Sequence, residues 1–373
     1  MENTFTIDQK ILSSVLSSMQ PICSKRTTLD TTSSILFNTN HKELIIKSTD
    51  LEISLQYSCF IKDSNLDEGQ SFLVSGKRLF DLVKELDGEI QFNINNNQVS
   101  LQAGPAQLSL NIKNAQEFPP FPERIENIMQ LDNAFLLEML DKVAFLIPQN
   151  NSNPALNGLY LEVSNTEIKM TATDGHCLVQ TTSGKYKLEE QKTWLLPRRA
   201  IFELKKILEN VEDQTIFLGT CGNQLVFSGT SFNFFTKLLA DPFPEYASIL
   251  DRKDFNQGTV SRINLVKSLR RSTCLLSGQF IATRFDFTKS ALSISLQNKE
   301  VGSMQENLSL EEFVDKEITI RFYAPYLLNG LQALSEDKIN FHLNNQSRPV
   351  IFESKEREIN FIYLVMPVSP SYN

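Results

Sequence analysis

The chain has 373 residues, 41% of them hydrophobic and 21% charged, and its formal net charge is −8. This composition is ordinary for a globular protein of two or three domains and excludes a disordered or fibrous chain. No stretch approaches the roughly 18 apolar residues that a membrane span needs, and the first residues lack the basic and apolar regions of a signal peptide.

Hydrophobic periodicity predicts two helices in each third of the chain, with strands around them. In chain order we expect helix 7–16, strands 44–48 and 53–57, helix 75–86 and strands 89–94, 98–102 and 107–112; then helix 133–147, strands 159–163 and 167–172, helix 196–208 and strands 215–218 and 224–228; then helix 263–276, strands 283–287, 291–296 and 317–322, helix 324–334 and strands 338–343 and 350–353. The pattern predicts an α+β fold with helices on one side of antiparallel sheets.

The same order of elements and landmarks recurs about every 125 residues. Pro119, Pro244 and Pro367 each close a hydrophobic run and are 125 and 123 positions apart, and Thr49-Asp50 recurs as Thr173-Asp174. A period of this length is the size of a domain. We therefore predict three similar domains, over residues 1–126, 127–252 and 253–373, and a symmetric assembly more than a single active-site cleft.

Basic residues gather on the predicted helices although the whole chain is acidic. Lys77 and Lys84 are seven positions apart and share one helical face, and Arg198 and Lys205 repeat that spacing. Lys267, Arg270 and Arg271 form a third cluster, whereas the last helix has no Lys or Arg. A charged helix face is ordinarily a solvated face, but its repetition favours a basic surface that meets phosphates without reading sequence.

The Asp174–His176 segment is the first candidate for catalysis or metal binding. The repeat argues against that reading, because Asp50 holds the equivalent position with no His beside it. Thr-Asp-Gly also makes a good strand-end turn, and Cys177 beside His176 is weak evidence for a nucleophile. Five scattered cysteines with no C-x-x-C pair are typical of reduced thiols. We expect no catalytic residue, metal or cofactor.

The apolar chain end, Tyr363–Val368, is a different kind of candidate. It follows the last predicted strand and can form a docking groove for a partner peptide.

Four features in order carry a family resemblance: the Ala172–His176 turn after Leu156-Asn-Gly158, the Phe243-Pro-x-Tyr246 element, the Val365-Met-Pro367 ending and the three-domain period. With these features the chain resembles the bacterial β sliding clamps, the processivity subunits of DNA polymerase III.

The resemblance implies a DNA-clamp fold in which two protomers close head to tail into a ring around duplex DNA. The protein would catalyse nothing, would bind DNA without sequence specificity and would tether the replicative polymerase. Implied partners are the DNA polymerase III alpha subunit, the clamp loader delta subunit, other polymerases and mismatch-repair proteins. The implied location is the bacterial cytoplasm, at the nucleoid during replication.

Site residues follow from the resemblance in three groups. The implied peptide pocket comprises Leu156, Thr173, Gly175, His176, Leu178, Pro244, Ile249, Val365, Met366 and Pro367. The implied DNA-facing residues are Arg26, Lys77, Lys84, Arg198, Lys205, Lys267 and Arg271. The implied dimer interface pairs Arg78, Leu108 and Leu110 of one protomer with Leu275 and Leu276 of the next.

The chain departs from the family pattern at several places. Thr27–Ser34 replaces a Pro-rich apolar stretch, Cys177 stands where Arg is frequent, and Asn153-Pro154-Ala155 replaces a basic or aromatic pair. The tail after Pro367 runs on to Asn373 and could partly cover the groove. These changes suggest an altered partner preference.

Two alternative readings remain. One is a hydrolase or metal-dependent enzyme that uses Asp174 and His176. The other is a paralogue of the clamp fold that serves as a partner scaffold without encircling DNA.

Overall fold

The computed structural model describes residues 3–40, 42–66, 69–277, 281–311, 313 and 317–368. The chain divides into two compact units, Met1–Leu137 with Arg199–Leu238 and Glu138–Arg198 with Leu239–Asn373, called here the N-terminal and C-terminal units. Each unit takes part of the middle third, so the three predicted domain ranges stay a prediction.

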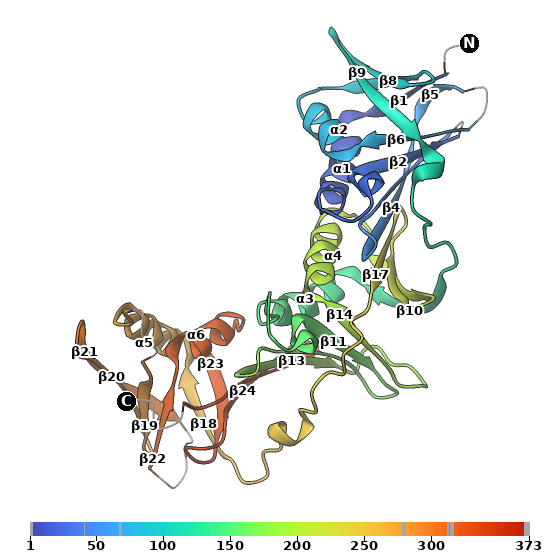
Figure 1. Cartoon of the computed structure of the whole chain (residues 1–373). Coiled ribbons are helices and arrows are strands. Elements are labelled where there is room, and N and C mark those ends of the chain that lie inside the picture. The colour runs from blue at the N-terminus through green and yellow to red at the C-terminus, as the bar shows by residue number, and fades with distance from the viewer. Residues whose placement is uncertain are drawn as a thin grey trace. The chain divides into compact units, whose positions relative to one another are not determined.

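The described residues form six α-helices, two in each third, as the periodicity predicts (Figure 1). They are α1 (Gln9–Cys23), α2 (Gly76–Val83), α3 (Asn133–Ala144), α4 (Arg198–Asn210), α5 (Arg262–Cys274) and α6 (Ala324–Gln332). The first helix was predicted too early, because Ile7 belongs to a strand and Asp8 is the N-cap. The Asp8 carboxylate accepts the backbone N–H of Lys10 at 2.9 Å, which satisfies a donor that the first turn leaves unpaired.

The N-terminal unit is built on one antiparallel sheet of thirteen described strands. In spatial order these are β10 (Glu126–Asp132), β15 (Thr215–Cys221), β16 (Gln224–Ser228), β17 (Phe232–Lys237), β4 (Ile53–Phe60), β3 (Glu43–Thr49), β2 (Ser34–Thr39), β6 (Gln70–Ser75), β9 (Ala106–Asn114), β8 (Gln98–Ala103), β7 (Glu89–Ile94), β1 (Asn3–Asp8) and β5 (Lys62–Asn65). The helices α1 and α2 pack against each other on one side of this sheet (Figure 1).

The C-terminal unit has an antiparallel sheet of twelve described strands. Their order is β14 (Lys192–Pro197), β11 (Gly158–Val163), β12 (Ile168–Thr173), β13 (Cys177–Ser183), β25 (Ile359–Val365), β24 (Val350–Glu356), β23 (Lys338–Leu343), β18 (Asn256–Ser261), β21 (Gly302–Glu311), β20 (Ala291–Asn298), β19 (Thr283–Phe287) and β22 (Ile318–Phe322). Together with α5 and α6 this confirms the predicted α+β class.

Each sheet is continuous across a boundary between repeats. In the N-terminal unit β17 pairs with β4, with Phe232 opposite Tyr57 and Thr236 opposite Ile53. In the C-terminal unit β25 pairs with β13, with Val365 opposite Cys177. These two junctions are equivalent in the repeat, since each joins the last strand of one domain to the fourth strand of the preceding domain.

The core of each unit is the apolar face of its sheet under the helices. Stacked aromatic rings fill it, among them Phe5 and Phe92 with centroids 4.8 Å apart and Phe313 and Phe341 at 5.7 Å. Among the described residues, no helix is long and apolar enough to cross a membrane.

Candidate functional site

The Thr173–Cys177 turn joins β12 to β13 and is held by its own polar side chains. The Asp174 carboxylate accepts the backbone N–H groups of His176 at 2.8 Å and Cys177 at 2.7 Å. The Thr173 hydroxyl donates to the Cys177 carbonyl at 2.6 Å. Gly175 has φ +94°, a conformation that favours glycine. Asp174 is therefore committed to shaping a turn, which leaves it poorly placed as an acid, base or metal ligand.

The His176 ring packs against α6. Its imidazole stacks on the Tyr326 ring, with centroids 5.4 Å apart and planes 17° from parallel. The Tyr363 hydroxyl donates to the Tyr326 backbone carbonyl at 2.6 Å, which fixes the start of α6 against β25. In the described part of the chain, no group of three or more His, Cys, Asp or Glu side chains could hold a metal ion.

Two further segments converge on this turn. The Leu156 Cδ1 lies 3.9 Å from the position that a Cβ on Gly175 would take, and the Asn151 side chain donates to the Asp174 carbonyl at 3.2 Å. On the other side, the Met366 backbone N–H donates to the His176 carbonyl at 2.9 Å. The structure thus brings together Leu156, the turn and the end of β25.

The sheet divides the predicted pocket residues between its two faces. Leu178 lies opposite Leu364 and is buried in a cluster with Ile351, whereas Val365 lies opposite Cys177 on the other face. Leu178 and Val365 are both fully buried, so neither side chain is exposed to a ligand in this structure. The predicted members that are accessible are Gly175, His176, Pro244, Ile249 and Met366, and Thr173 and Pro367 are half-buried.

The segment that carries Pro244 and Ile249 is pinned across the sheet by aromatic side chains. The Phe243 ring stacks on Tyr160 at 4.9 Å. The Tyr246 hydroxyl donates to the Glu162 carboxylate and accepts from the Thr171 hydroxyl at 3.3 Å. Burial, followed by the bond to Glu162, raises the pKa of the Tyr246 phenol, so it stays a neutral donor. Tyr246 also packs against the Leu178 cluster, which places this segment beside β13.

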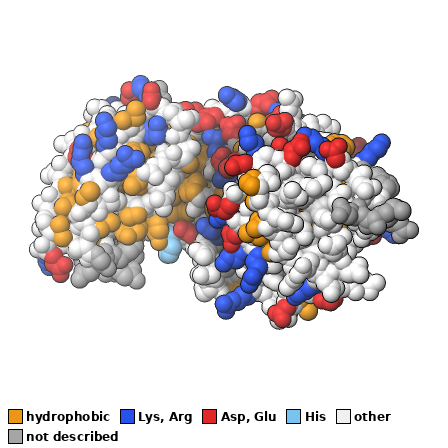
Figure 2. Space-filling view, turned by 90° about the horizontal axis from the view of Figure 1, so that it is seen from above, with side chains coloured by type: hydrophobic (Ala, Val, Ile, Leu, Met, Phe, Trp, Pro, Cys, Tyr) orange, Lys and Arg blue, Asp and Glu red, His pale blue; other side chains and the backbone are white. Residues whose placement is uncertain are grey.

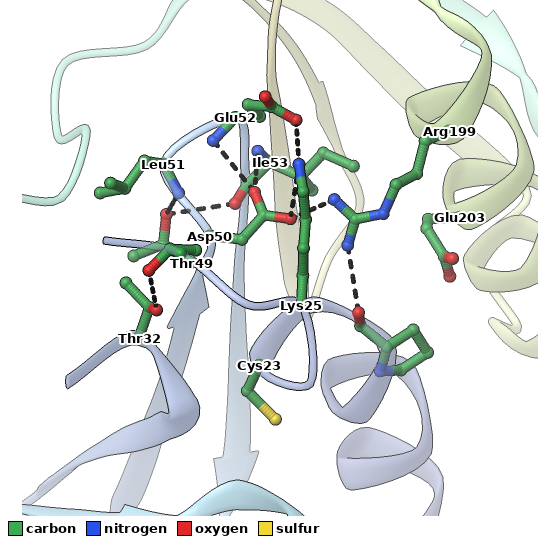
Figure 3. Close-up of polar contacts among 12 residues, drawn as sticks. Cys23, Lys25, Thr32, Thr49, Asp50, Leu51, Glu52, Ile53, Arg199 and Glu203 are labelled. Atoms are coloured by element: carbon green, nitrogen blue, oxygen red, sulfur yellow. Dashed lines mark hydrogen bonds and ion pairs between the residues drawn. The ribbon is translucent and has the colours of Figure 1, made fainter. Parts of the chain in front are cut away.

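A buried ion pair fills the equivalent junction in the N-terminal unit (Figure 3). The fully buried Asp50 carboxylate accepts the backbone N–H groups of Glu52 at 3.0 Å and Ile53 at 2.8 Å, as Asp174 does in its own turn. Arg199 on α4 forms an ion pair with Asp50 and donates to the Pro21 carbonyl at 3.1 Å. Lys25 lies 3.9 Å from Asp50 and pairs with Glu52.

Comparison of the two junctions identifies a residue that sequence reasoning missed. Tyr326 stands at the start of α6 as Arg199 stands at the start of α4, and each contacts the turn at the end of the third strand of the preceding domain. Aligning the helices at Leu204 and Leu331 would have pointed to Tyr326. An aromatic contact between His176 and Tyr326 therefore stands at this junction, where the other junction has a buried ion pair.

The predicted DNA-facing residues differ in solvent exposure and in whether their side chains have a partner within the chain. Arg26, Lys77 and Lys267 are exposed and have no side-chain partner among the described residues. Lys84 lies 3.5 Å from Asp81, and Arg271 lies 2.5 Å from Glu306. Arg198 and Lys205 are half-buried: the Arg198 Nε donates to the Ile147 carbonyl at 2.8 Å, and Lys205 lies 5.9 Å from the centroid of the Phe202 ring. Figure 2 shows Lys and Arg side chains gathered on the C-terminal unit, at the left of the view.

The predicted interface residues lie beside two incomplete strand edges. Residues 106–111 of β9 pair only with β8, and residues 302–309 of β21 pair only with β20, within the described chain. Leu108 and Leu110 are half-buried on β9, Leu275 and Leu276 are half-buried after α5, and Arg78 is exposed. Val301, next to β21, is 49% exposed. Exposed edges of this kind are templates for pairing with another chain.

Three of the departures from the family pattern can be placed and one cannot. Asn153 caps a short 3-10 helix, Pro154–Asn157, and its side chain accepts the Ala155 backbone N–H at 3.1 Å. The Thr27–Ser34 loop is held by a hydrogen bond of 2.6 Å between the hydroxyls of Thr27 and Thr32. Cys177 is buried, which raises the pKa of its thiol, and it does not present a side chain at the mouth of the site. The tail residues Ser369–Asn373 lie outside the described residues.

Comparisons with known proteins agree along the whole chain. Residues 3–122, 130–245 and 248–369 match the family models of the DNA polymerase III beta subunit N-terminal, central and C-terminal domains. The beta sliding clamp of Streptococcus pneumoniae is 24% identical over 98% of both chains, and that of Pseudomonas aeruginosa is 24% identical over 98% of this chain and 99% of the relative.

Solved structures are similar over the same length. A Pseudomonas aeruginosa DNA polymerase sliding clamp superimposes with a TM-score of 0.90 at 22% identity, covering 98% of this chain and all of that one. The Bacillus subtilis DNA polymerase sliding clamp has a TM-score of 0.89 at 20% identity, covering 99% of this chain and all of that one.

Proposed function

The chain belongs to the DNA polymerase III beta subunit family, the beta sliding clamps, which are non-catalytic processivity subunits, and we propose that two copies close head to tail into a ring around duplex DNA. The ring keeps a replicative polymerase on its template, because a topological tether can slide along DNA without binding one sequence. It needs no cofactor. The expected location is the cytoplasm, at the nucleoid during replication.

The main support for the ring is a third junction between repeats, at β9 and β21, where the two strands do not pair with each other within the described part of one chain. Within the chain, β17 pairs with β4 and β25 pairs with β13. By the same repeat, β9 should pair with β21, yet the edges of both strands that would meet are unpaired in the described chain. A second copy completes both pairings, each β9 with the β21 of the other copy. Such reciprocal head-to-tail contacts close a symmetric dimer and remove the exposed edges.

Side chains at this third junction repeat the pattern of the closed ones. Asn298 accepts the backbone N–H of Glu300 at 2.9 Å, as Asp50 accepts that of Glu52 at 3.0 Å. Arg78 has the same place on α2 that Arg199 has on α4. We therefore expect Arg78 of one protomer to approach Asn298 and Glu300 of the partner subunit, with Leu108 and Leu110 covering Val301 and the Leu275–Leu276 segment there.

The exposed Lys and Arg residues give the ring its contact with DNA. Arg26, Lys77, Lys84, Lys267 and Arg271 are exposed, while Arg198 and Lys205 are half-buried. Contacts to phosphates are independent of sequence and weaken as salt displaces them. A few such contacts in a chain of net charge −8 would favour sliding over tight binding.

The site around His176 is the proposed docking pocket for partner peptides. Its accessible members are apolar or aromatic, lie on pinned segments and gather near the end of β25, where Leu and Phe side chains of an extended peptide can bind. The specific partners proposed for this pocket are the polymerase alpha subunit, the clamp loader delta subunit, other polymerases and mismatch-repair proteins.

Retention on circular DNA tests this function. The protein is loaded by a bacterial clamp loader on a nicked circular plasmid, and half of the sample is then cut once by a restriction enzyme. We expect the circular DNA to retain the protein and the linear DNA to release it, since a ring slides off free ends. Equal retention on both, or on neither, would contradict encirclement and favour a scaffold that binds only partners.

A further inference from the structure

The charged residues at the rim of the proposed pocket are all acidic. The segments that carry its accessible members and the start of α6 are residues 148–157, 173–177, 241–251, 323–329 and 366–368. They contain no Lys or Arg, but they contain Asp174, Asp241, Glu245 and Asp251. All of these segments belong to the C-terminal unit.

Two of the four carboxylates are compensated by the protein itself. The Asp174 carboxylate accepts two backbone N–H groups in its turn. The Asp251 carboxylate lies 3.5 Å from the Lys253 ammonium group. Asp241 and Glu245 are exposed and have no ion-pair partner among the described residues.

The basic residues that adjoin the rim are already engaged. Arg252 forms an ion pair with Glu353, which also contacts His342 at 2.8 Å. Arg348 lies over the Phe255 ring at 5.9 Å, and Lys169 lies 3.3 Å from Glu167. Among the rim residues themselves, the uncompensated charge is therefore negative.

The backbone at Glu245 is held in place by its neighbours. Phe243 and Tyr246 dock onto the sheet through the Tyr160 ring and the Glu162 carboxylate. Pro244 and Glu245 stand between these two anchors and are exposed. A carboxylate on an anchored segment, next to a predicted pocket residue, stays close to every ligand that enters, and at physiological salt its field reaches about 8 Å.

We propose that the pocket selects extended peptides whose apolar anchors are flanked by Lys or Arg, and disfavours peptides flanked by Asp or Glu. The proposal rests on the proposed function, because it takes the site around His176 as the docking pocket. Asp241 and Glu245 would be its specificity-determining residues, since rim charges of one sign repel like-charged partners and steer opposite ones.

Two synthetic peptides test it. Both carry the same core with one Leu and one Phe anchor, and they differ only in having Lys or Glu on both sides. Fluorescence anisotropy with the full-length protein should show about tenfold tighter binding of the Lys-flanked peptide at low salt, and a smaller preference as salt is added. The double variant Asp241→Lys with Glu245→Lys should lose or reverse the preference.

Glu190→Lys with Glu189→Lys is the matched control, because it changes the net charge equally at the opposite end of β13. The control should keep the preference of the natural protein. Equal binding of the two peptides, tighter binding of the Glu-flanked peptide, or an unchanged preference in the double rim variant would overturn the inference and leave the pocket intact. Binding of neither peptide would overturn both the inference and the pocket.

Discussion

The His176 ring stacks on the Tyr326 ring with 5.4 Å between centroids, and this contact stands in the repeat where Arg199 pairs with the buried Asp50. The two junctions use the same backbone turn and the same helix position. One is filled by an ion pair, and the other presents aromatic side chains beside accessible apolar residues. The equivalent positions therefore differ in role. In the N-terminal unit they stabilise the fold through an ion pair, and in the C-terminal unit we propose that they bind partners.

Arg199→Ala should destabilise the N-terminal unit. The substitution leaves the fully buried Asp50 carboxylate with its two backbone N–H donors and with Lys25, at 3.9 Å, as the remaining nearby cation. Removing one partner of a buried pair costs about 3 kcal/mol. Urea unfolding measures the loss. Lys206→Ala on the exposed side of α4 is the control and should cost under about 1 kcal/mol. Equal losses in the two variants would show that the Asp50 pair has no special role.

Tyr326→Ala should weaken peptide binding without unfolding the protein. The loss of one aromatic contact corresponds to about a fivefold weaker affinity. Tyr326→Phe keeps the ring that His176 stacks on and should bind as the natural protein does. The measurement is peptide anisotropy together with a thermal melt of each variant. Unchanged affinity of the Ala variant would remove Tyr326 from the pocket.

Glu356 should make the C-terminal unit sensitive to acid. Burial opposes ionisation, but hydrogen bonds from Lys142 and Ser335 outweigh it and hold the pKa of the Glu356 carboxyl below its ordinary 4.5. The Lys142 ammonium group lies 2.8 Å away. A carboxyl with a lowered pKa in the folded state stabilises the fold above pH 4.5, and that contribution is lost as the pH falls through the folded-state value.

Glu356→Gln should therefore cost about 2 kcal/mol at neutral pH, and the difference from the natural protein should shrink in acid. Urea unfolding at several pH values checks this. Glu358→Gln, two residues along and 63% exposed in its side chain, is the control and should change little at any pH. A deficit of Glu356→Gln that stays constant from neutral pH into acid would refute the lowered pKa.

Leu276→Asp and Ile249→Asp should separate the two proposed surfaces. A carboxylate at Leu276 would be buried without a partner at the dimer seam and should give monomers that still bind the peptide. A carboxylate at Ile249 should abolish peptide binding and leave the dimer intact. Sedimentation and anisotropy on both variants give the answer. A dimeric Leu276→Asp variant would show that the seam has been put in the wrong place.

The sequence predicted the elements whose signal is local. All six helices were predicted because the apolar stripe of an amphipathic helix can be recognised from residues that are close together in the sequence. The strand β13 was missed because both of its faces are buried, which removes the alternation that marks a strand. The strand β25 was also missed, although its first residues alternate between buried and more exposed positions. The chain end was therefore expected to follow the last strand, whereas residues to Val365 belong to it.

The Pro that ends this segment lies at an unusual place for a proline. Pro residues at the ends of hydrophobic runs usually close edge strands, but Pro367 follows β25, which lies between β13 and β24. Pairing between distant strands depends on contacts far apart in the chain, so the pattern of one segment cannot reveal it. For the same reason the sequence did not predict the Asp50–Arg199 pair or the place of Tyr326.

The central claim is that two copies form the ring, and sedimentation of the natural protein at low micromolar concentration tests it most directly. The ring requires a native mass of twice 42.4 kDa, because only a second copy pairs the open edges of β9 and β21. A stable species of 42.4 kDa at that concentration would contradict the claim.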